Sequence, residues 1–204
     1  MIDRRQHWEG VYRKQPAEQV SWFQPHAAAS LRLITEGVGG DARIIDVGGG
    51  ASVLVDGLLD VGFRQLTVLD LAEPALASSR ARLGERARDV VWMAGNVTQV
   101  DLPAATFDVW HDRAVFHFLT DPVDRARYVA QVLKSVKPGG RVIVATFGPD
   151  GPLQCSGLDV MRYAPDALHA EFGAPFQLLK HETEIHYTPT GKEQTFVYCY
   201  CMRT

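Results

Sequence analysis

The sequence is poor in cysteine and has no long hydrophobic run. Its 204 residues include three cysteines at irregular spacing, so a disulfide framework is excluded and the reducing cytoplasm is the expected location. Cys199 and Cys201 lack the second pair of ligands that a zinc site needs, and we expect no metal ion. No stretch approaches the roughly 18 apolar residues of a membrane-spanning helix, so we expect no membrane partner.

An excess of charge of either sign is also lacking. The chain has 21 lysines and arginines against 24 acidic residues, a formal net charge of -3, and no long basic block. Dedicated nucleic-acid binders usually carry a basic surface, so we expect no nucleic-acid partner. No repeat or low-complexity stretch divides the chain, and its 46% of hydrophobic residues suits a single domain over residues 1–204.

The sequence does have a regular alternation of strand-like and helix-like segments. Short runs rich in β-branched residues cover 43–47, 66–69, 90–92, 107–111 and 141–146. Segments of helical character between and before them predict helices over 3–14, 25–36, 73–83 and from Asp121 to a turn at 137–140. Strands that alternate with helices form parallel sheets covered on both faces, so we predict an α/β, Rossmann-like, doubly wound fold.

The end of the chain departs from this alternation. Residues 176–187 and 195–202 are two strand-like runs joined by Thr188-Pro189-Thr190-Gly191-Lys192, with no helix between them. Such a pair predicts an antiparallel hairpin. We therefore expect a mostly parallel seven-stranded sheet that ends in an antiparallel hairpin.

A glycine turn follows the first predicted strand. Asp46-Val47-Gly48-Gly49-Gly50-Ala51-Ser52 leads from the strand into the start of a helix, the position where open α/β sheets bind ligands. The dinucleotide fingerprint would need glycine where Val53 stands. The Asp46 carboxylate would also repel a pyrophosphate and attract a cationic ligand such as S-adenosylmethionine (SAM), which carries a sulfonium and an ammonium.

Two further polar residues lie at the ends of predicted strands. Asp70 closes the second strand, where a carboxylate can accept hydrogen bonds from both hydroxyls of an adenosine ribose. Asn96, followed by Val97, ends the third strand near the expected place of an adenine. The alternative is that Asp46 and Asp70 only form turns, but their joint placement at successive strand ends favours a ligand site.

Together these motifs resemble those of the class I SAM-dependent methyltransferases over about residues 40–147. Ser52 replaces the family's third glycine and is a candidate N-cap of the following helix, and Asn96 replaces its aspartate. Val136-Lys137-Pro138-Gly139-Gly140 matches the family's turn before the fifth strand. The resemblance implies SAM as cofactor and a cofactor site made of Asp46, Gly48, Gly49, Gly50, Asp70, Leu71, Asn96, Val97, Asp112, Tyr12 and Trp22.

The segment after the fourth predicted strand is polar where a buried strand should be apolar. In the class I fold this strand end faces the reacting methyl group, so His111, Arg113 and His117 are the predicted catalytic residues. The alternatives are a structural ion pair of Asp112 with Arg113 that caps the next helix, and a surface role for His117. The Asp112-Arg113-Ala114 step resembles thiopurine-type S-methyltransferases and, more loosely, elongation-factor lysine methyltransferases.

The segment from Trp110 to Phe118 and two more segments are expected to border the acceptor. Residues 1–30 carry aromatic residues and resemble the lids of both groups; the alternative is that these aromatics pack the first helix on the sheet. The stretch 148–158 has too little periodicity to form a helix or strand. It holds Cys155, whose thiol is expected to be exposed and to line the pocket rather than react. Cys199 and Cys201 are expected to be packing residues.

The sequence therefore predicts a SAM-dependent enzyme that methylates a small-molecule acceptor, either a thiol or chalcogen or an acidic metabolite. Methyl transfer would be a direct displacement, in which the protein aligns the acceptor and His117 or His111 removes a proton where one must leave. Two alternatives stay open. One is a protein lysine methyltransferase, and the other is a SAM-binding protein without catalysis.

Overall fold

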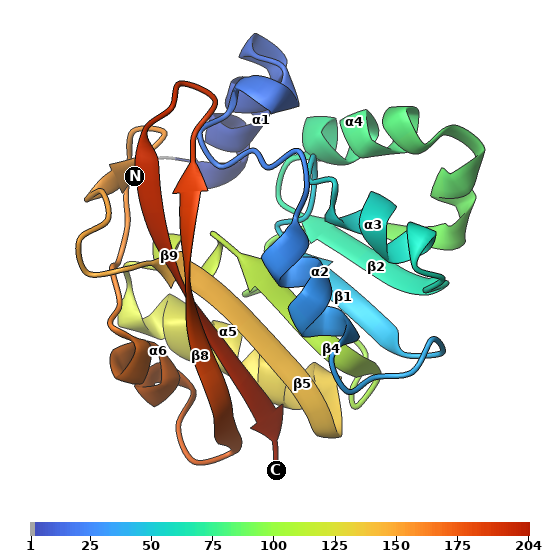
Figure 1. Ribbon diagram of the computed structural model, residues 1–204, viewed down its shortest axis with the longest axis vertical. Coiled ribbons are helices and arrows are strands. Elements are labelled where there is room, and N and C mark those ends of the chain that lie inside the picture. The colour runs from blue at the N-terminus through green and yellow to red at the C-terminus, as the bar shows by residue number, and fades with distance from the viewer. Residues whose placement is uncertain (1–2) are drawn as a thin grey trace.

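The structure, a computed structural model, describes residues 3–204. Its centre is a seven-stranded sheet (Figure 1). The strands are β1 (Arg43–Val47), β2 (Gln65–Asp70), β3 (Val90–Ala94), β4 (Phe107–Arg113), β5 (Val136–Phe147), β8 (Phe176–Tyr187) and β9 (Glu193–Arg203). They lie in the order β3-β2-β1-β4-β5-β9-β8.

The direction of the strands agrees with the prediction. The pairs β1–β2, β1–β4, β2–β3 and β4–β5 are parallel. Strand β9 runs antiparallel to both of its neighbours, β5 and β8. The predicted α/β, mostly parallel, seven-stranded sheet that ends in an antiparallel hairpin is therefore confirmed.

Helices cover both faces of the sheet (Figure 1). Residues of α2, α3 and α4 pack in one hydrophobic cluster, and residues of α5 and α6 pack in another on the opposite face. Helix α1 lies beside α4. The helices are α1 (Arg4–Lys14), α2 (Ala28–Thr35), α3 (Leu54–Asp60), α4 (Glu73–Leu83), α5 (Pro122–Ser135) and α6 (Pro165–Phe172), with short 3₁₀ turns η1 (Ala17–Gln19), η2 (Gly84–Asp89) and η3 (Phe116–Phe118).

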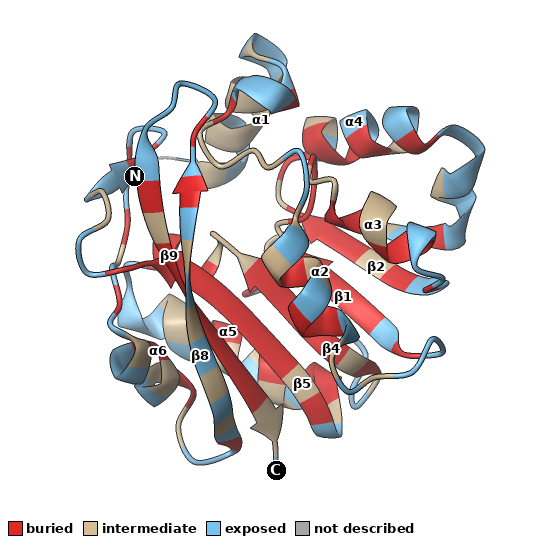
Figure 2. Cartoon of the chain, in the orientation of Figure 1, coloured by how far each residue is buried: buried red, intermediate tan, exposed pale blue. Residues whose placement is uncertain are grey.

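The two clusters follow from the alternation of side chains along the central strands. Ile44 of β1 packs in the cluster with α2, α3 and α4, whereas its neighbour Ile45 packs in the cluster with α5 and α6. Both residues are almost fully buried. Figure 2 shows the same burial along the central strands, which explains why their sequences are continuous apolar runs.

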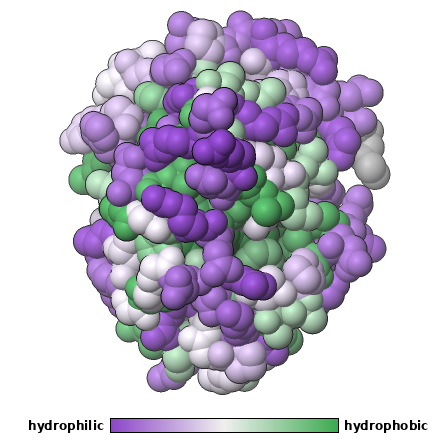
Figure 3. Space-filling view, turned by 90° about the vertical axis from the view of Figure 1, so that its right-hand side faces the viewer, coloured by the Kyte–Doolittle hydropathy of each residue, from purple (hydrophilic) through white to green (hydrophobic). Residues whose placement is uncertain are grey.

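The outer surface is largely hydrophilic, as the charged content of the sequence suggests. On the face shown in Figure 3, hydrophobic residues gather toward the middle and hydrophilic residues surround them. Within residues 3–204, every helix is too short or too polar to cross a bilayer.

The predicted start of a helix at Asp121 is confirmed. Asp121 is the N-cap of α5, and its carboxylate accepts a hydrogen bond from the Val123 N–H at 2.8 Å. Ser52 lies just before the cap of α3, which is Val53; its hydroxyl accepts from the Leu54 N–H at 3.1 Å. The serine thus helps to start α3 although it is not the cap residue.

Two predictions about irregular segments are wrong. Residues 137–140 belong to β5, which begins at Val136, and the pairing of β5 with β4 shifts register between Phe107 and Val109. The stretch 148–158 is not entirely irregular, because it contains β6 (Gln154–Cys155) and reaches β7 (Leu158–Asp159), which pair as a small antiparallel hairpin. Both features are local hydrogen-bonding patterns too short to leave a periodic signal.

Candidate functional site

The glycine turn after β1 has no room for side chains. Gly48 has a positive φ of 73°, and its N–H donates to the Leu69 carbonyl at 2.7 Å. A Cβ on Gly48 would lie 2.0 Å from Val115 Cγ2, and one on Gly50 would lie 2.5 Å from Asp70 Oδ2. The backbone therefore forms this wall of the site, and a ligand can approach it closely.

Asp70 lies at the end of β2 and is held by backbone donors. Its two oxygens accept hydrogen bonds from the Gly50 N–H at 3.0 Å and the Ala72 N–H at 2.8 Å. Only 8% of the residue is exposed. This burial raises the pKa of Asp70 to about 6, the two backbone donors oppose the rise, and the nearby Asp46 carboxylate adds to it.

Asp46 faces His111 across two neighbouring strands. Asp46 Oδ1 accepts from His111 Nδ1 at 2.7 Å, and His111 Nε2 lies 2.9 Å from the Ser30 hydroxyl of α2. Asp46 Oδ2 is buried and has no hydrogen-bond partner within residues 3–204. Both ring nitrogens of His111 are thus engaged, and Asp46 and His111 both border the smaller of two adjoining pockets.

Asn96 stands at the turn after β3 and bonds to its own loop. Its side-chain carbonyl accepts from the Thr98 N–H at 3.0 Å and from the Thr98 hydroxyl at 2.9 Å. This arrangement occupies the carbonyl, so the NH₂ group is the part of the side chain that remains for a ligand. Val97 beside it is buried.

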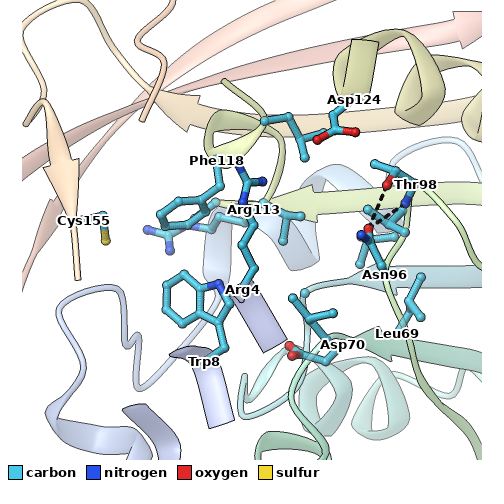
Figure 4. A pocket seen from close by; sticks show the side chains of 18 of the residues that line it. Arg4, Trp8, Leu69, Asp70, Asn96, Thr98, Arg113, Phe118, Asp124 and Cys155 are labelled. Carbon is cyan, nitrogen blue, oxygen red and sulfur yellow. Dashed lines mark hydrogen bonds between the residues drawn. The ribbon is translucent and has the colours of Figure 1, made fainter. Parts of the chain in front are cut away.

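The larger pocket joins these residues to an aromatic end (Figure 4). Asp70 and Asn96 lie at one end, and Phe118 and Cys155 lie toward the other (Figure 4). Other lining residues include Arg4, Trp8, Tyr12, Trp22, Gly48, Leu71, Val97, Arg113, Val115, Asp124 and Phe147. The structure therefore brings most of the predicted cofactor residues to one cavity.

Aromatic side chains from the N-terminal segment form the roof of this pocket. Trp8 of α1 packs edge-to-face on Trp22, with ring centroids 5.5 Å apart, and on Phe118 at 5.0 Å. Tyr12 packs on Trp22 at 6.3 Å. Burial and the Asp70 charge both raise the pKa of Tyr12, so its hydroxyl is neutral. The first two residues of the predicted lid, 1–30, lie outside the described residues.

Arg113 does not form the structural ion pair with Asp112 that was the alternative to a catalytic role. Its guanidinium contacts Glu184 of β8 at 3.3 Å, the Tyr198 hydroxyl at 3.2 Å and the Trp22 carbonyl at 3.3 Å. It also stacks over the Phe196 ring, 3.9 Å from the centroid. The side chain is 9% exposed, and it still borders both pockets.

Asp112, the partner of Arg113 in that alternative, points to the opposite face of the sheet, toward Tyr128. It accepts hydrogen bonds from the Val115 N–H at 2.9 Å, the Phe116 N–H at 3.1 Å and the Tyr128 hydroxyl at 2.6 Å. Asp112 therefore binds the backbone that leads into the η3 turn, whose N-cap is Val115, and the ion pair of that alternative does not form. Burial raises the pKa of Asp112 to about 7, against these three donors.

His117 is fully buried rather than at the surface. Its Nδ1 accepts from the Phe147 N–H at 3.4 Å, and its Nε2 has no hydrogen-bond partner within residues 3–204. Burial, with a contribution from the Arg113 charge, lowers the pKa of His117 to about 3. The ring is thus neutral, and neither His117 nor His111 is among the residues that line the larger pocket.

Two further residues differ from expectation. Cys155 lines the larger pocket as predicted, but it is 7% exposed rather than open to solvent, and burial raises the pKa of its thiol. Trp110 was expected to border the acceptor, yet it lies in the core, where its indole donates to the Tyr128 hydroxyl at 2.9 Å.

Residues that the sequence did not indicate complete the surroundings of Arg113. Glu184 and Tyr198 come from the terminal hairpin, and Gln24 comes from the N-terminal segment. Gln24 and Glu184 are 160 residues apart in the chain. No local pattern marks such a pair, and only the order of the strands could have suggested it.

The part of the chain that the structure describes holds no cluster of three or more His, Cys, Asp or Glu side chains that could bind a metal ion.

Comparison with known proteins identifies related sequences. Residues 45–144 match the family model described as "Methyltransferase domain". The chain is 26% identical over 147 residues to an eEF1A lysine and N-terminal methyltransferase of Danio rerio, covering 71% of this chain and 21% of that protein. It is 31% identical over 130 residues to a probable S-adenosylmethionine-dependent methyltransferase of Mycolicibacterium smegmatis, covering 64% of this chain and 47% of that one. It thus spans about a fifth of the first relative and about half of the second.

Solved structures share the fold. The Burkholderia thailandensis 1,6-didemethyltoxoflavin-N1-methyltransferase, determined with 1,6-didemethyltoxoflavin and S-adenosylhomocysteine bound, aligns with a TM-score of 0.72 at 21% identity. The alignment covers 98% of this chain and 87% of that one. With the sheet order and the glycine turn described above, the family match and the two relatives support a class I SAM-dependent methyltransferase, and the solved structure shares its fold.

Proposed function

We propose that this protein is an enzyme that transfers a methyl group from SAM to a small-molecule acceptor carrying a thiol or chalcogen, or an acidic group. The observation that carries the proposal is the continuous pocket from Asp70 and Asn96 to Phe118 and Cys155. Aromatic side chains roof this pocket, so its far end suits a small molecule better than a protein surface.

The residues at the first end of the pocket fit SAM. The glycine turn leaves open the space that a Cβ would fill, and Asp70 is placed to accept bonds from ribose hydroxyls. The buried, unpaired oxygen of Asp46 suits an ammonium group. Because Thr98 occupies the Asn96 carbonyl, we propose that Asn96 meets the adenine through its NH₂ group, with Leu71 and Val97 packing beside it.

When bound, SAM supplies a methyl group on a positively charged sulfur and so needs little chemical activation. The residues of this chain then align the acceptor and exclude water. His117 is a poor base because its pKa is about 3, and both nitrogens of His111 are engaged. We therefore propose that the acceptor arrives with a readily lost proton, which favours a thiol, with a reference pKa of about 8.5, over a lysine amine at about 10.4.

A protein lysine methyltransferase is the second candidate. The similarity to an eEF1A lysine and N-terminal methyltransferase favours it, and Asp124 puts a carboxylate on the pocket wall where an ammonium could pair. A SAM-binding protein without catalysis is the third. It would bind the cofactor tightly and show no turnover with any acceptor.

The deciding experiment is an acceptor screen that measures release of S-adenosylhomocysteine (SAH). Aliphatic and aromatic thiols, hydroxylated acids and lysine peptides are incubated side by side with SAM and the protein. We expect turnover with a thiol or an acidic small molecule, strongly reduced at subsaturating SAM in Asp70→Asn and retained in Asp60→Asn, an exposed control on α3. Methylation of lysine peptides alone would overturn the small-molecule proposal.

A further inference from the structure

The segment 21–24, which carries Trp22 over the pocket and lies between η1 and α2, is hydrogen-bonded to the sheet. We call it the lid segment. Its anchors come from β4 and from β8, far along the chain. The hydrogen bonds are His186 Nε2 to the Ser21 carbonyl at 2.7 Å, Arg113 Nη1 to the Trp22 carbonyl at 3.3 Å, and Gln24 Nε2 to Glu184 Oε1 at 2.9 Å.

Glu184 is the centre of these anchors. One carboxylate oxygen accepts from Gln24 of the lid segment at 2.9 Å. The other accepts from Arg113 Nη2 at 3.3 Å and from the Tyr198 hydroxyl at 3.1 Å. The side chain is only 18% exposed, so solvent screens these contacts weakly. A single carboxylate thus ties the lid segment, β4 and β9 together.

The charge of Glu184 also keeps Arg113 in its present position. The other acceptors around this guanidinium, the Tyr198 hydroxyl and the Trp22 carbonyl, are neutral. Without an opposing carboxylate, a nearly buried guanidinium would be driven toward water. Arg113 would then release the Trp22 carbonyl, and the packing of Trp22 on Trp8 would loosen.

We infer that Glu184 is a positioning residue that closes the lid segment over the bound cofactor. The inference rests on the proposed function, because it concerns retention of the cofactor in the same pocket. Glu184 acts through Gln24 and Arg113, and it is not among the residues that line the pocket. Closure of the roof would therefore be controlled from β8, an edge strand of the sheet.

The test replaces Glu184 with glutamine. The side chain keeps its shape, but the charge that opposes Arg113 is lost and one acceptor oxygen becomes an NH₂ donor. Arg113 has no acceptor for this group, so only the Gln24 amide, by turning its carbonyl oxygen toward it, can accept. Glu182→Gln is the matched control: it removes the same charge from the same strand, where Glu182 pairs with Arg32 and Lys180 and does not contact the lid segment.

Two measurements are made on each protein. Hydrogen exchange reports opening of the amides of residues 21–24 without any ligand, and stopped-flow tryptophan fluorescence reports the dissociation rate of SAH. For Glu184→Gln we expect both rates to rise about tenfold or more, the effect of losing charge-assisted hydrogen bonds. For Glu182→Gln we expect both rates, and the melting temperature, to stay near those of the wild type.

Equal exchange in Glu184→Gln and the wild type would overturn the inference, as would equal acceleration in Glu182→Gln. If Glu184→Gln does not fold, Gln24→Ala removes one anchor from the lid side, and a rise of about threefold in exchange is expected in its place; no rise would overturn the inference. Failure of the wild type to bind SAH would contradict the proposed function, while the ligand-free exchange would still decide the role of Glu184.

Discussion

At the scale of single residues, Asp70 is the carboxylate on which the cofactor site most depends. Both of its oxygens are already fixed by backbone donors, so they are oriented before any ligand binds. We expect Asp70→Asn to weaken SAH binding by roughly 10- to 150-fold, which corresponds to about 1.5 to 3 kcal/mol for hydrogen bonds to a charged group. Titration calorimetry checks this, and an unchanged dissociation constant in the folded variant would remove Asp70 from the site.

The raised pKa of Asp70 adds a pH dependence. An ionised carboxylate accepts hydrogen bonds on both oxygens, whereas the protonated form has lost part of that capacity. Because the pKa of Asp70 is about 6, SAH affinity should fall as the pH is lowered through about 6. Calorimetry between about pH 5 and pH 8 measures the trend. The Asp70→Asn variant should lack it, and an equal slope in both proteins would assign the effect to another group.

The sequence alone could locate some of the site residues in the fold but not others. Asp46 and Asp70 end strands that carry clear β-branched patterns, so their neighbourhood was predictable from chain order alone. The partner of Arg113 was not, because Glu184 is 71 residues away on the terminal hairpin. The burial of His117 was also hidden, since a polar residue in a polar segment gives no sign that the fold encloses it.

At the scale of elements, the loss of an N-cap should destabilise the protein more when the capped helix buries core residues than when it does not. Asp121 caps α5, which places Tyr128 and Val132 in the core, and Asp3 caps α1, which has no fully buried residue. We expect Asp121→Ala to lower the free energy of unfolding by about 1 kcal/mol. Asp3→Ala should lower it much less, because fraying of α1 exposes little core. Urea denaturation of both variants gives the comparison, and an equal loss would contradict it.

Elements with strong local signals were predictable, and those defined by tertiary contacts were not. The strands of the parallel sheet are short runs rich in β-branched and apolar residues, apart from the polar end of β4, and α5 has an aspartate N-cap followed by proline. By contrast, the β6–β7 hairpin pairs only two residues on each side, and α6 is short. The extension of β5 across Pro138 arises from its pairing with β4, which no local pattern encodes.

At the scale of the whole molecule, two carboxylates beside the glycine turn set the charge of the cofactor site. Asp46 and Asp70 both border it, and neither is neutralised by a lysine or arginine in the described contacts. A pyrophosphate placed there would be repelled, whereas a sulfonium and an ammonium would be attracted. We expect SAM and SAH to bind and NAD to bind far more weakly. Calorimetry with the three ligands checks this, and NAD binding tighter than SAM would contradict the assignment.

The stability of the whole protein should also depend on pH through its buried carboxyl groups. Burial raises the pKa of Asp70 to about 6 and that of Asp112 to about 7, above the value of about 3.9 in an unfolded chain. The folded state therefore binds more protons than the unfolded state between these values, so this stability is present at low pH and is lost as the pH rises.

For these two groups alone, the free energy of unfolding should fall as the pH is raised from about 4 to about 7. Asp112→Asn removes one of the titrating groups and keeps an acceptor for the Val115 and Phe116 N–H groups, so its stability should depend less steeply on pH in this window. Urea denaturation at several pH values measures the slopes for the variant and the wild type. Identical slopes would show that Asp112 is ionised in the folded protein throughout this range, held so by the donors around it rather than neutralised by burial.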